Sequence, residues 1–342
     1  METIAPSPGR VGHPSGAAAA ACVDRGWRAA DAGLPTVPPP ASWMAVASGG
    51  EPPAPMPGAA AAAPADPETA AIVDRLENGP GFAVVRRLPV AGRSLDEVRT
   101  LFRALCHRLG TPVAQTRQGD VFVDVAHGEG PAAAKVGRWY GSRAELSFHT
   151  DRCDLLALLA VRGARSGGVT RIVSSVAIAE EIARTRPDLA RVLGEDFSWR
   201  VPEVPFPGAP PVFRQPVLAH RDGRFSCCFN RFQIEAGHRF PGQERLSAAQ
   251  AEALDLFERL AGADGFALSL RLEPGDLQLV NNHIVLHARS SYEDDAAAGR
   301  LLLRAWLCSA ASRPLHPARA VAFGGCAPGT VRGYYLPGHG TA

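Results

Sequence analysis

The chain has 342 residues, of which 46% are hydrophobic and 20% are charged, a composition typical of globular proteins. Lysine and arginine total 36 against 34 aspartate and glutamate residues, so the formal net charge of +2 gives no electrostatic reason to expect nucleic acid or an anionic membrane as partner. We therefore expect a small-molecule partner, with no nucleic acid and no membrane. A homo-oligomer is compatible with these properties but is not predicted.

Cysteine usage and the absence of long apolar runs indicate the compartment. Seven cysteines are present, an odd number with no CxxC pair, which argues against a disulfide framework. No apolar run approaches the roughly 20 residues that a membrane helix needs, and the first residues lack the basic region and apolar stretch of a signal peptide. We therefore expect a cytoplasmic protein with reduced thiols.

Residues 1–65 are dominated by alanine, proline and glycine and carry little periodic apolar pattern. Such a composition cannot bury enough apolar surface to offset the entropy of ordering, so we predict a disordered extension. A lid or partner-binding tail is the alternative, with Trp27 and Trp43 as its aromatic anchors. The folded domain is then expected to span residues 66–342.

Two helices and a strand are predicted first in the folded domain. Asp66 followed by proline is typical of a helix start, and this helix should end near Gly79. A strand is predicted at Phe82–Val85. Ser94 opens a capping box for a second helix that should end at Gly110.

Beyond residue 110 the chain reads mostly as short strands separated by glycine, proline and aspartate turns. Two helices interrupt them, one from about Val176 to Leu193 and one from the capping-box residue Ser247 to Gly262. This pattern predicts an α+β fold with a double-stranded β-helix (jelly-roll) core and flanking and inserted helices, not a parallel sheet. The predicted strands are Val121–Val125, Leu155–Val161, Thr170–Ser174 and Leu268–Leu272.

The segment from Glu145 to Asp151 alternates as a strand does. Glu145, Ser147, His149 and Asp151 should share one face. His149 and Asp151 could then offer an imidazole nitrogen and a carboxylate oxygen to one metal ion. By itself this His-x-Asp pair is weak evidence for a metal site, because a hydrogen-bonded histidine beside a solvated aspartate is the commoner case.

A second candidate ligand follows much later in the chain. A turn at Pro274-Gly275-Asp276 precedes an apolar strand that carries His287, 136 positions after Asp151 (287 − 151). Two histidines and one carboxylate form the facial triad that leaves three positions of an octahedral iron(II) open. His283 and His287 share a strand face, so the residues alone do not choose between them.

Six short motifs between about residue 80 and residue 310 belong together. They are Phe148-His149-Thr150-Asp151, Gly167-Gly168-Val169-Thr170, Pro274-Gly275-Asp276, Asn281-Asn282-His283, Leu286-His287-Ala288-Arg289 and Arg300-Leu301-Leu302-Leu303-Arg304-Ala305-Trp306. With these motifs the chain resembles the TauD/TfdA family of iron(II)- and 2-oxoglutarate-dependent dioxygenases, in the clavaminate synthase-like superfamily. The resemblance implies that His287 completes a catalytic metal site with His149 and Asp151. It also implies that Arg304 binds the distal carboxylate of 2-oxoglutarate and that Thr170 supplies a hydroxyl to it.

The residue chemistry agrees with that role for Arg304. Strand alternation puts Arg300, Arg304 and Trp306 on one face. A guanidinium among apolar residues needs an anion, and its fork suits a carboxylate. An ion pair within the barrel is the alternative for Arg304, and a threonine without function is the alternative for Thr170.

The implied activity is oxidation of an unactivated C–H bond, by hydroxylation or by desaturation or cyclisation. Dioxygen and 2-oxoglutarate would be consumed, and succinate and carbon dioxide released. A small molecule such as an amino acid or a secondary-metabolite intermediate is the expected substrate. Retention of Asp151 disfavours halogenation, since related halogenases replace this carboxylate with a small residue. The alternative function is a cupin-like metal or small-acid binding protein without turnover.

Substrate contacts are predicted close to the metal strand. Glu145 and Ser147 share its metal-facing side, and a buried Glu145 could bind an amine or guanidinium. A glutamate hydrogen-bonded within the sheet is the alternative. Trp139 and Tyr140 precede them on a predicted loop over the barrel mouth.

Arg289 is a further candidate for substrate binding. It shares a strand face with His287 and could bind a carboxylate. Pairing with the nearby Glu293 or Asp294 is the favoured alternative.

Overall fold

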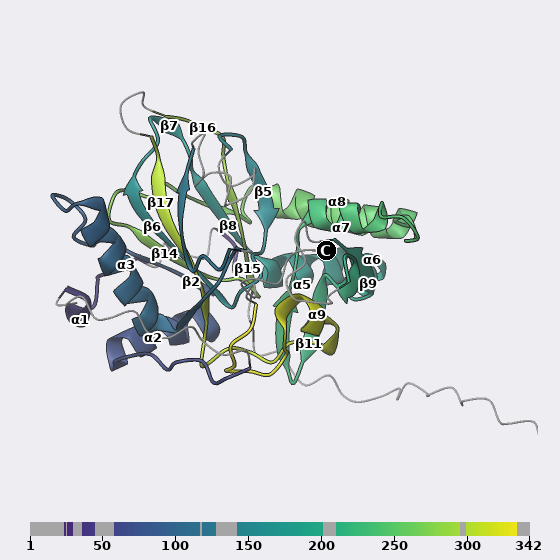
Figure 1. Cartoon of the computed structure of the whole chain (residues 1–342). Coiled ribbons are helices and arrows are strands. Elements are labelled where there is room, and N and C mark those ends of the chain that lie inside the picture. The colour runs from purple at the N-terminus through teal and green to yellow at the C-terminus, as the bar shows by residue number, and fades with distance from the viewer. Residues whose placement is uncertain are drawn as a thin grey trace, which may run out of the picture.

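The computed structural model describes residues 24, 26–29, 36–44, 58–116, 118–127, 142–200, 210–294 and 299–333. Strands occupy the middle of the described fold, and helices flank them on two sides (Figure 1). The helices α2 (Pro67–Glu77) and α3 (Leu95–Leu109) lie on one side, and a second group that includes α8 (Ala248–Gly262) lies on the other (Figure 1). The described chain thus has an α+β architecture, as the sequence predicts.

The larger sheet has seven strands in the order β1-β2-β14-β6-β17-β3, and β4 also pairs with β17. Alternation along its central strands separates two environments. Leu159 and Leu303 pack with α2 and α3, whereas Leu158 and Leu302 face the opposite side of the sheet. The strands are β1 (Thr36–Val37), β2 (Phe82–Val85), β3 (Thr111–Val113), β4 (Phe122–Ala126), β6 (Leu155–Arg162), β14 (Leu277–Asn281) and β17 (Leu301–Cys308).

A second sheet has four antiparallel strands in the order β13-β8-β15-β5. Its register places His287 opposite His149 and Arg289 opposite Thr170. Side chains directly opposite each other lie close together on one face. The sheet therefore brings these two pairs together. Its strands are β5 (Leu146–His149), β8 (Thr170–Ser174), β13 (Leu268–Leu270) and β15 (Val285–Arg289).

The remaining elements form a helical region with small two-stranded sheets and short segments near the chain ends. The pairs are β9 with β10, β11 with β12, and β7 with β16. These elements are α1 (Ala41–Met44), β7 (Ser166–Gly167), α5 (Ser175–Thr185), α6 (Pro187–Leu193), β9 (Asp196–Trp199), β10 (Phe213–Pro216), β11 (Leu218–Arg221), β12 (Arg224–Cys227), α7 (Arg231–His238), β16 (Tyr292–Glu293), η1 (Pro317–Arg319) and α9 (Ala320–Phe323).

The helix starts predicted from capping residues are confirmed. The side chains of Asp66, Ser94 and Ser247 each accept a backbone N–H of the first turn, and the last two form complete capping boxes. The single helix predicted from Val176 to Leu193 is wrong. Pro187 lacks an N–H and disfavours a helical conformation at the residue before it, so the chain forms two helices, α5 and α6.

Parts of the segment 1–65, predicted to be disordered, are ordered. Strand β1 pairs in parallel with β2. Trp43 is fully buried and its Nε1 donates to Thr69 Oγ1 at 2.9 Å. Trp27 Nε1 donates to Pro80 O at 2.7 Å. The prediction is wrong for these parts because each indole combines apolar burial with a satisfied N–H. The rest of the segment up to residue 57 lies outside the described residues.

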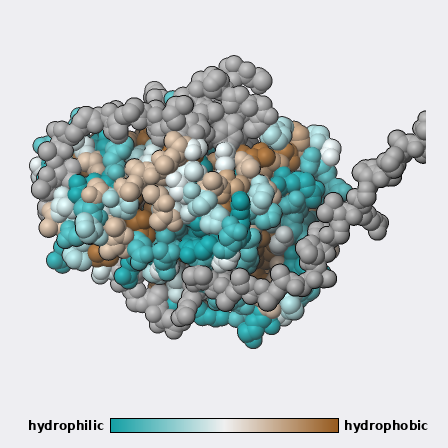
Figure 2. All heavy atoms as spheres, turned by 90° about the horizontal axis from the view of Figure 1, so that it is seen from below, coloured by the Kyte–Doolittle hydropathy of each residue, from teal (hydrophilic) through white to brown (hydrophobic). Residues whose placement is uncertain are grey.

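On the face seen in Figure 2, the apolar residues lie in several small areas that polar residues separate. Within the described ranges, no helix has the length and apolar character needed to cross a membrane.

Candidate functional site

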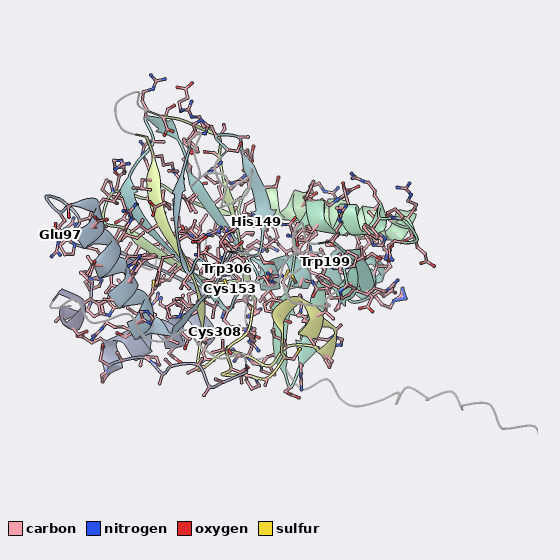
Figure 3. The ribbon with its side chains drawn as sticks, viewed as in Figure 1. Glu97, His149, Cys153, Trp199, Trp306 and Cys308 are labelled. Atoms are coloured by element: carbon pink, nitrogen blue, oxygen red, sulfur yellow. The ribbon has the colours of Figure 1, made fainter. Side chains whose placement is uncertain are left out.

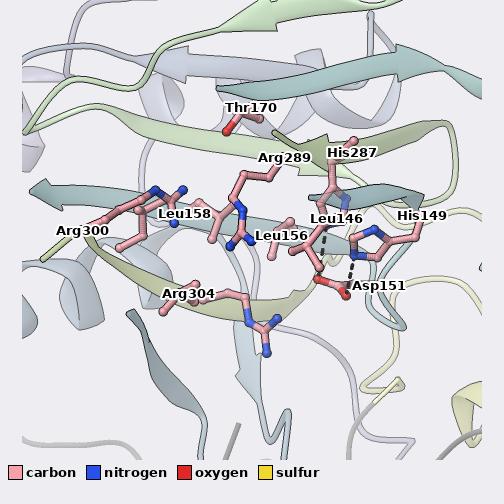
Figure 4. A pocket seen from close by; sticks show the side chains of 13 residues that line it. Leu146, His149, Asp151, Leu156, Leu158, Thr170, His287, Arg289, Arg300 and Arg304 are labelled. Carbon is pink, nitrogen blue, oxygen red and sulfur yellow. Dashed lines mark ion pairs between the residues drawn. The ribbon is translucent and has the colours of Figure 1, made fainter. Parts of the chain in front are cut away.

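Two histidines and one aspartate converge between the two sheets. His149 ends β5, Asp151 follows it, and His287 lies on β15. One ligand atom from each lies within 4.8 Å of the others. Asp151 Oδ1 is 4.0 Å from His149 Nε2, and Asp151 Oδ2 is 3.8 Å from His287 Nε2 (Figure 4). The structure thus brings together the three predicted metal ligands.

The local electrostatics favour the protonation states that metal binding needs. Burial alone would raise the pKa of Asp151, but the nearby Arg304 guanidinium lowers it below its ordinary value. Burial lowers the pKa of His287 to about 3, and His149 and Arg304 act in the same direction. A charged carboxylate and a neutral imidazole are the forms that coordinate a cation.

Neighbouring groups hold the candidate ligands in place. His149 Nδ1 lies 2.8 Å from Ser147 O, so it is the donor nitrogen and Nε2 is left for a metal. Trp306 Nε1 donates to Asp151 Oδ2 at 3.1 Å. The backbone N–H of Asp151 donates to Asn282 Oδ1 at 3.0 Å. In Figure 3, His149 and Trp306 lie between helix α3, where Glu97 is labelled, and the helical region that contains Trp199.

A pocket that is partly open to solvent extends from these candidate ligands. Residues of both larger sheets line it, so it lies between them. One wall is aliphatic, and the rest is strongly basic (Figure 4). The lining residues are Val125, Leu146, His149, Asp151, Leu156, Leu158, Thr170, His287, Ala288, Arg289, Arg300, Leu302 and Arg304.

Arg304 on β17 lies beside the metal-ligand group. Its side chain is 3% exposed, and its charge acts on both Asp151 and His287. Its Nε donates to Gln115 Oε1 at 2.5 Å, while Gln115 Nε2 donates to Arg304 O at 3.0 Å. These bonds fix the guanidinium at the pocket wall.

Arg300 lies in the pocket just before β17. Its guanidinium sits 5.2 Å from the centre of the Tyr292 ring, and its Nη1 has no hydrogen-bond partner within the described ranges. Burial and the charge of Arg289 lower the pKa of Arg300 to about 10. Asp294 accepts its backbone N–H at 2.7 Å. Sequence alternation placed Arg300 on the face of Arg304 without assigning it a role.

Arg289 is held by backbone oxygens. Its Nη2 donates to Ser142 O at 2.6 Å and to Ala144 O at 2.5 Å. Its Nε and Nη1 have no hydrogen-bond partner among the residues that the structure describes. Burial lowers its pKa. Its guanidinium lies 4.8 Å from the Tyr292 ring centre.

The predicted pairing of Arg289 with Glu293 or Asp294 is wrong. Glu293 instead pairs with Arg165 at 2.7 Å, and Asp294 pairs with Arg143 at 3.5 Å. The two acids follow β15 on a segment that turns away along β16, whereas Arg289 points into the pocket (Figure 4).

Glu145 and Ser147 are exposed and do not line the pocket, so the geometry gives no support to their predicted substrate contacts. The register of β15 against β5 shifts, pairing His287 with His149 but Arg289 with Leu146. A bulge of this kind offsets side-chain alternation by one residue. Leu146, not Glu145 or Ser147, therefore joins His149 at the pocket. Trp139 and Tyr140 lie outside the described residues.

His283 does not belong to the metal-ligand group. It is 1% exposed, and its Nε2 lies 2.9 Å from Asp154 Oδ1. Arg332 also donates to Asp154, from Nε at 2.9 Å. His283 is therefore part of a buried polar network behind the site.

Three side chains around the ligands carried no predicted role: Asn282, Trp306 and Gln115. The first two lie within motifs that carry the resemblance: Trp306 shares β17 with Arg304, and Asn282 lies in the turn between β14 and β15, so their proximity could have been inferred. Gln115 lies 189 positions from Arg304, and no local pattern marks it.

Two imidazoles and one carboxylate at one end of a buried pocket are the donor set of a mononuclear non-haem iron centre, with further positions left for other ligands. The site therefore defines an oxygenase-type metal enzyme. A family model described as taurine catabolism dioxygenase TauD, TfdA family matches residues 51–306. The chain belongs to this family of iron(II)- and 2-oxoglutarate-dependent dioxygenases.

Individual relatives agree with this assignment. The chain is 33% identical over 243 residues to FR-33289 synthase of Streptomyces rubellomurinus (strain ATCC 31215), covering 69% of this chain and 71% of that protein. It is 26% identical over 161 residues to a uridine-5'-phosphate dioxygenase of Streptomyces sp, covering 46% of this chain and 57% of that protein.

Solved structures share the fold. An asparagine oxygenase in complex with Fe(II), 2S,3S-3-hydroxyasparagine and succinate has a TM-score of 0.55 at 20% identity, covering 70% of this chain and 77% of that chain. The non-haem iron oxygenase OrfP in complex with Fe and alpha-ketoglutaric acid has a TM-score of 0.51 at 17% identity, covering 70% of this chain and 79% of that chain.

Proposed function

We propose that this dioxygenase oxidises an unactivated C–H bond of a small polar molecule, by hydroxylation or by desaturation or cyclisation. His149, Asp151 and His287 hold the iron(II). The observation that carries the proposal is the convergence of these three side chains at the end of a buried pocket rich in arginine. The names of the asparagine oxygenase and the uridine-5'-phosphate dioxygenase refer to small polar molecules, which supports a substrate of that kind.

The residues of the chain bind, orient and shield the reactants. The bound iron, together with 2-oxoglutarate and dioxygen, supplies the oxidation chemistry. Trp306 keeps the Asp151 carboxylate in one orientation through its hydrogen bond. The aliphatic wall of Leu156, Leu158 and Leu302 excludes water and presents an apolar surface to the C–H bond.

Arg304 and Thr170 are the proposed ligands of 2-oxoglutarate. Both line the pocket, and both are buried. Arg300 is a second candidate for binding the distal carboxylate of 2-oxoglutarate. Its Nε lies close to the backbone of Gly168, 3.3 Å from the position that a Cβ on that residue would take. It therefore lies beside the segment that leads into Thr170, farther along the pocket than Arg304 (Figure 4).

The proposal also covers the fold of the core, the bounds of the domain and the location of the protein. The seven-stranded and four-stranded sheets, with the pocket between them, would form a double-stranded β-helix. Residues 66–342, together with the ordered parts of the segment before them, would make up the domain. A cytoplasmic location is in keeping with the free thiols of the described cysteines.

Anaerobic titration with iron(II) and 2-oxoglutarate tests the proposal. We expect a weak visible metal-to-ligand charge-transfer band in the wild type, lost in His149→Ala and His287→Ala. The exposed His220 provides the matched control, because His220→Ala should retain the band. No band in the wild type, or a band unchanged in the two ligand variants, contradicts the proposal. Succinate release under air with candidate substrates separates an enzyme from a metal-binding protein without turnover.

A further inference from the structure

The pocket holds more positive charge than the proposed reaction uses. Three arginines line it, and Asp151 is the one carboxylate among the lining residues that the structure describes. Iron(II) and the 2-oxoglutarate dianion cancel each other's charge when both are bound. An excess of two positive charges therefore remains in the lining, and burying such an excess is costly unless an anion joins it.

Arg289 is the clearest part of this excess. Its side chain is buried, with 6% of the residue exposed. Two backbone carbonyls engage Nη2, but Nε and Nη1 have no partner in the described part of the chain. The acidic residues that follow Arg289 most closely in the sequence form ion pairs with other residues, Glu293 with Arg165 and Asp294 with Arg143. Buried N–H donors in a pocket lining call for an acceptor that the described residues do not supply.

The position of Arg289 suits the reacting molecule. It lies two residues after His287 on β15, which is about 7 Å along a strand. In Figure 4 its guanidinium points into the pocket and lies between those of Arg300 and Arg304. A group bound by Arg289 would thus leave the rest of a small molecule within reach of the metal.

The carbonyls of Ser142 and Ala144 hold the guanidinium in one orientation. Ordering the side chain therefore adds little entropic cost when a ligand binds. Charge-assisted hydrogen bonds from a fixed, desolvated guanidinium to an oxyanion are among the stronger polar contacts in proteins.

We propose that Arg289 binds an oxyanion group carried by the primary substrate, namely a carboxylate, sulfonate or phosphonate. This inference rests on the proposed function and narrows its substrate class to anions. Arg289 is then a specificity-determining residue: neutral analogues of the substrate lack the charge-assisted bond to it, and the positive charge of the pocket repels cationic analogues.

Anion binding to the full chain, loaded anaerobically with iron(II) and 2-oxoglutarate, tests the proposal. Acetate, methanesulfonate and methylphosphonate are the probes, and dimethyl sulfone is the uncharged match to methanesulfonate. Each is titrated while perturbation of the charge-transfer band is recorded. We expect at least one oxyanion, and not the sulfone, to bind the wild type. The oxyanion that binds most tightly identifies the chemical class.

Variants assign the binding to Arg289. Arg289→Gln should raise the Kd of that oxyanion at least tenfold and change the Kd of 2-oxoglutarate less than twofold. Arg289→Lys, which keeps the charge, should recover part of the affinity and decides the matter if Arg289→Gln does not fold. The exposed Arg271 is the control, since Arg271→Gln should bind all probes as the wild type does.

Three results would overturn the proposal. The wild type could bind none of the oxyanions, or Arg289→Gln could bind them unchanged. Alternatively, Arg289→Gln could lose 2-oxoglutarate, which would assign Arg289 to the cosubstrate. Failure of the wild type to form the charge-transfer band at all would instead count against the proposed function, so the two failures are distinguishable.

Discussion

The indole Nε1 of Trp306 donates a hydrogen bond to Oδ2 of Asp151 at 3.1 Å. Trp306 lies on β17 of the seven-stranded sheet, while Asp151 follows β5 of the four-stranded sheet. One hydrogen bond therefore ties the orientation of a proposed metal ligand to the opposite wall of the pocket. Groups that orient ligands in this way commonly change metal affinity by 10- to 100-fold when removed.

Trp306→Phe should weaken iron(II) binding by about tenfold, because the carboxylate loses its fixed donor. Anaerobic iron(II) titration measures this. Trp199→Phe is the control, since Trp199 is also buried and its Nε1 donates to Gln215 O at 3.0 Å. Both variants should lose some stability, but only Trp306→Phe should lose metal affinity. Equal iron(II) affinity of Trp306→Phe and Trp199→Phe would refute a positioning role for Trp306.

Arg304→Met should raise the Kd of 2-oxoglutarate by at least tenfold, because a charge-assisted bond to a carboxylate contributes about 1.5–3 kcal/mol. Titration of the anaerobic charge-transfer band measures the Kd. The Kd of 2-oxoglutarate for Arg300→Met is measured in the same way and compared with that for Arg304→Met. If Arg300→Met causes the larger loss while Arg304→Met leaves the Kd near wild type, the distal carboxylate belongs to Arg300.

The stability of the protein should fall as the pH drops from 6.5 towards 4. Burial lowers the pKa of His283 to about 4, although Asp154 opposes the shift. Below pH 6.5 the unfolded chain protonates this histidine while the folded chain keeps it neutral, so the unfolded state binds more protons. The loss that His283 alone causes is about 3 kcal/mol, at about 1.4 kcal/mol per pKa unit. His287, whose pKa is about 3, acts in the same direction, whereas Glu77, whose pKa burial raises to about 7, acts in the opposite direction. Asp154, whose pKa is about 2 because Arg332 and His283 outweigh its burial, adds a further loss only below about pH 4.

His283→Gln tests this pH dependence. An amide N–H can still donate to Asp154, but the side chain does not titrate. Urea unfolding at several pH values between 4 and 6.5 should therefore give a flatter profile for the variant than for the wild type. Parallel profiles for the two proteins would mean that His283 does not cause the acid sensitivity.

Trp43→Ala should destabilise the fold by about 3–5 kcal/mol, the range for truncating a large buried aromatic residue. The reason is that Trp43 is fully buried and bonded to Thr69, although it lies in a segment whose composition predicts disorder. Chemical unfolding measures the change. An unfolding free energy within 0.5 kcal/mol of wild type, as at an ordinary surface site, would show that this segment is not part of the stable fold.

Local rules explain what could be predicted without the structure. Helix starts at Asp66, Ser94 and Ser247 follow from caps that involve only neighbouring residues. Alternation along β17 correctly put Arg304 and Trp306 on one face, because that strand pairs with β6 without a shift around these positions.

The sequence by itself determined the chemical types of the ligands, the capped helices and the strand that carries Arg304, since each depends on residues close together in the chain. The tertiary structure decided the rest. A bulge between β5 and β15 brought Leu146 to the pocket instead of Glu145. Cross-strand register brought His287 to His149, while His283 was left with Asp154. The buried, partly unpaired state of Arg289 likewise depends on segments that meet only after folding, so no local pattern could predict it.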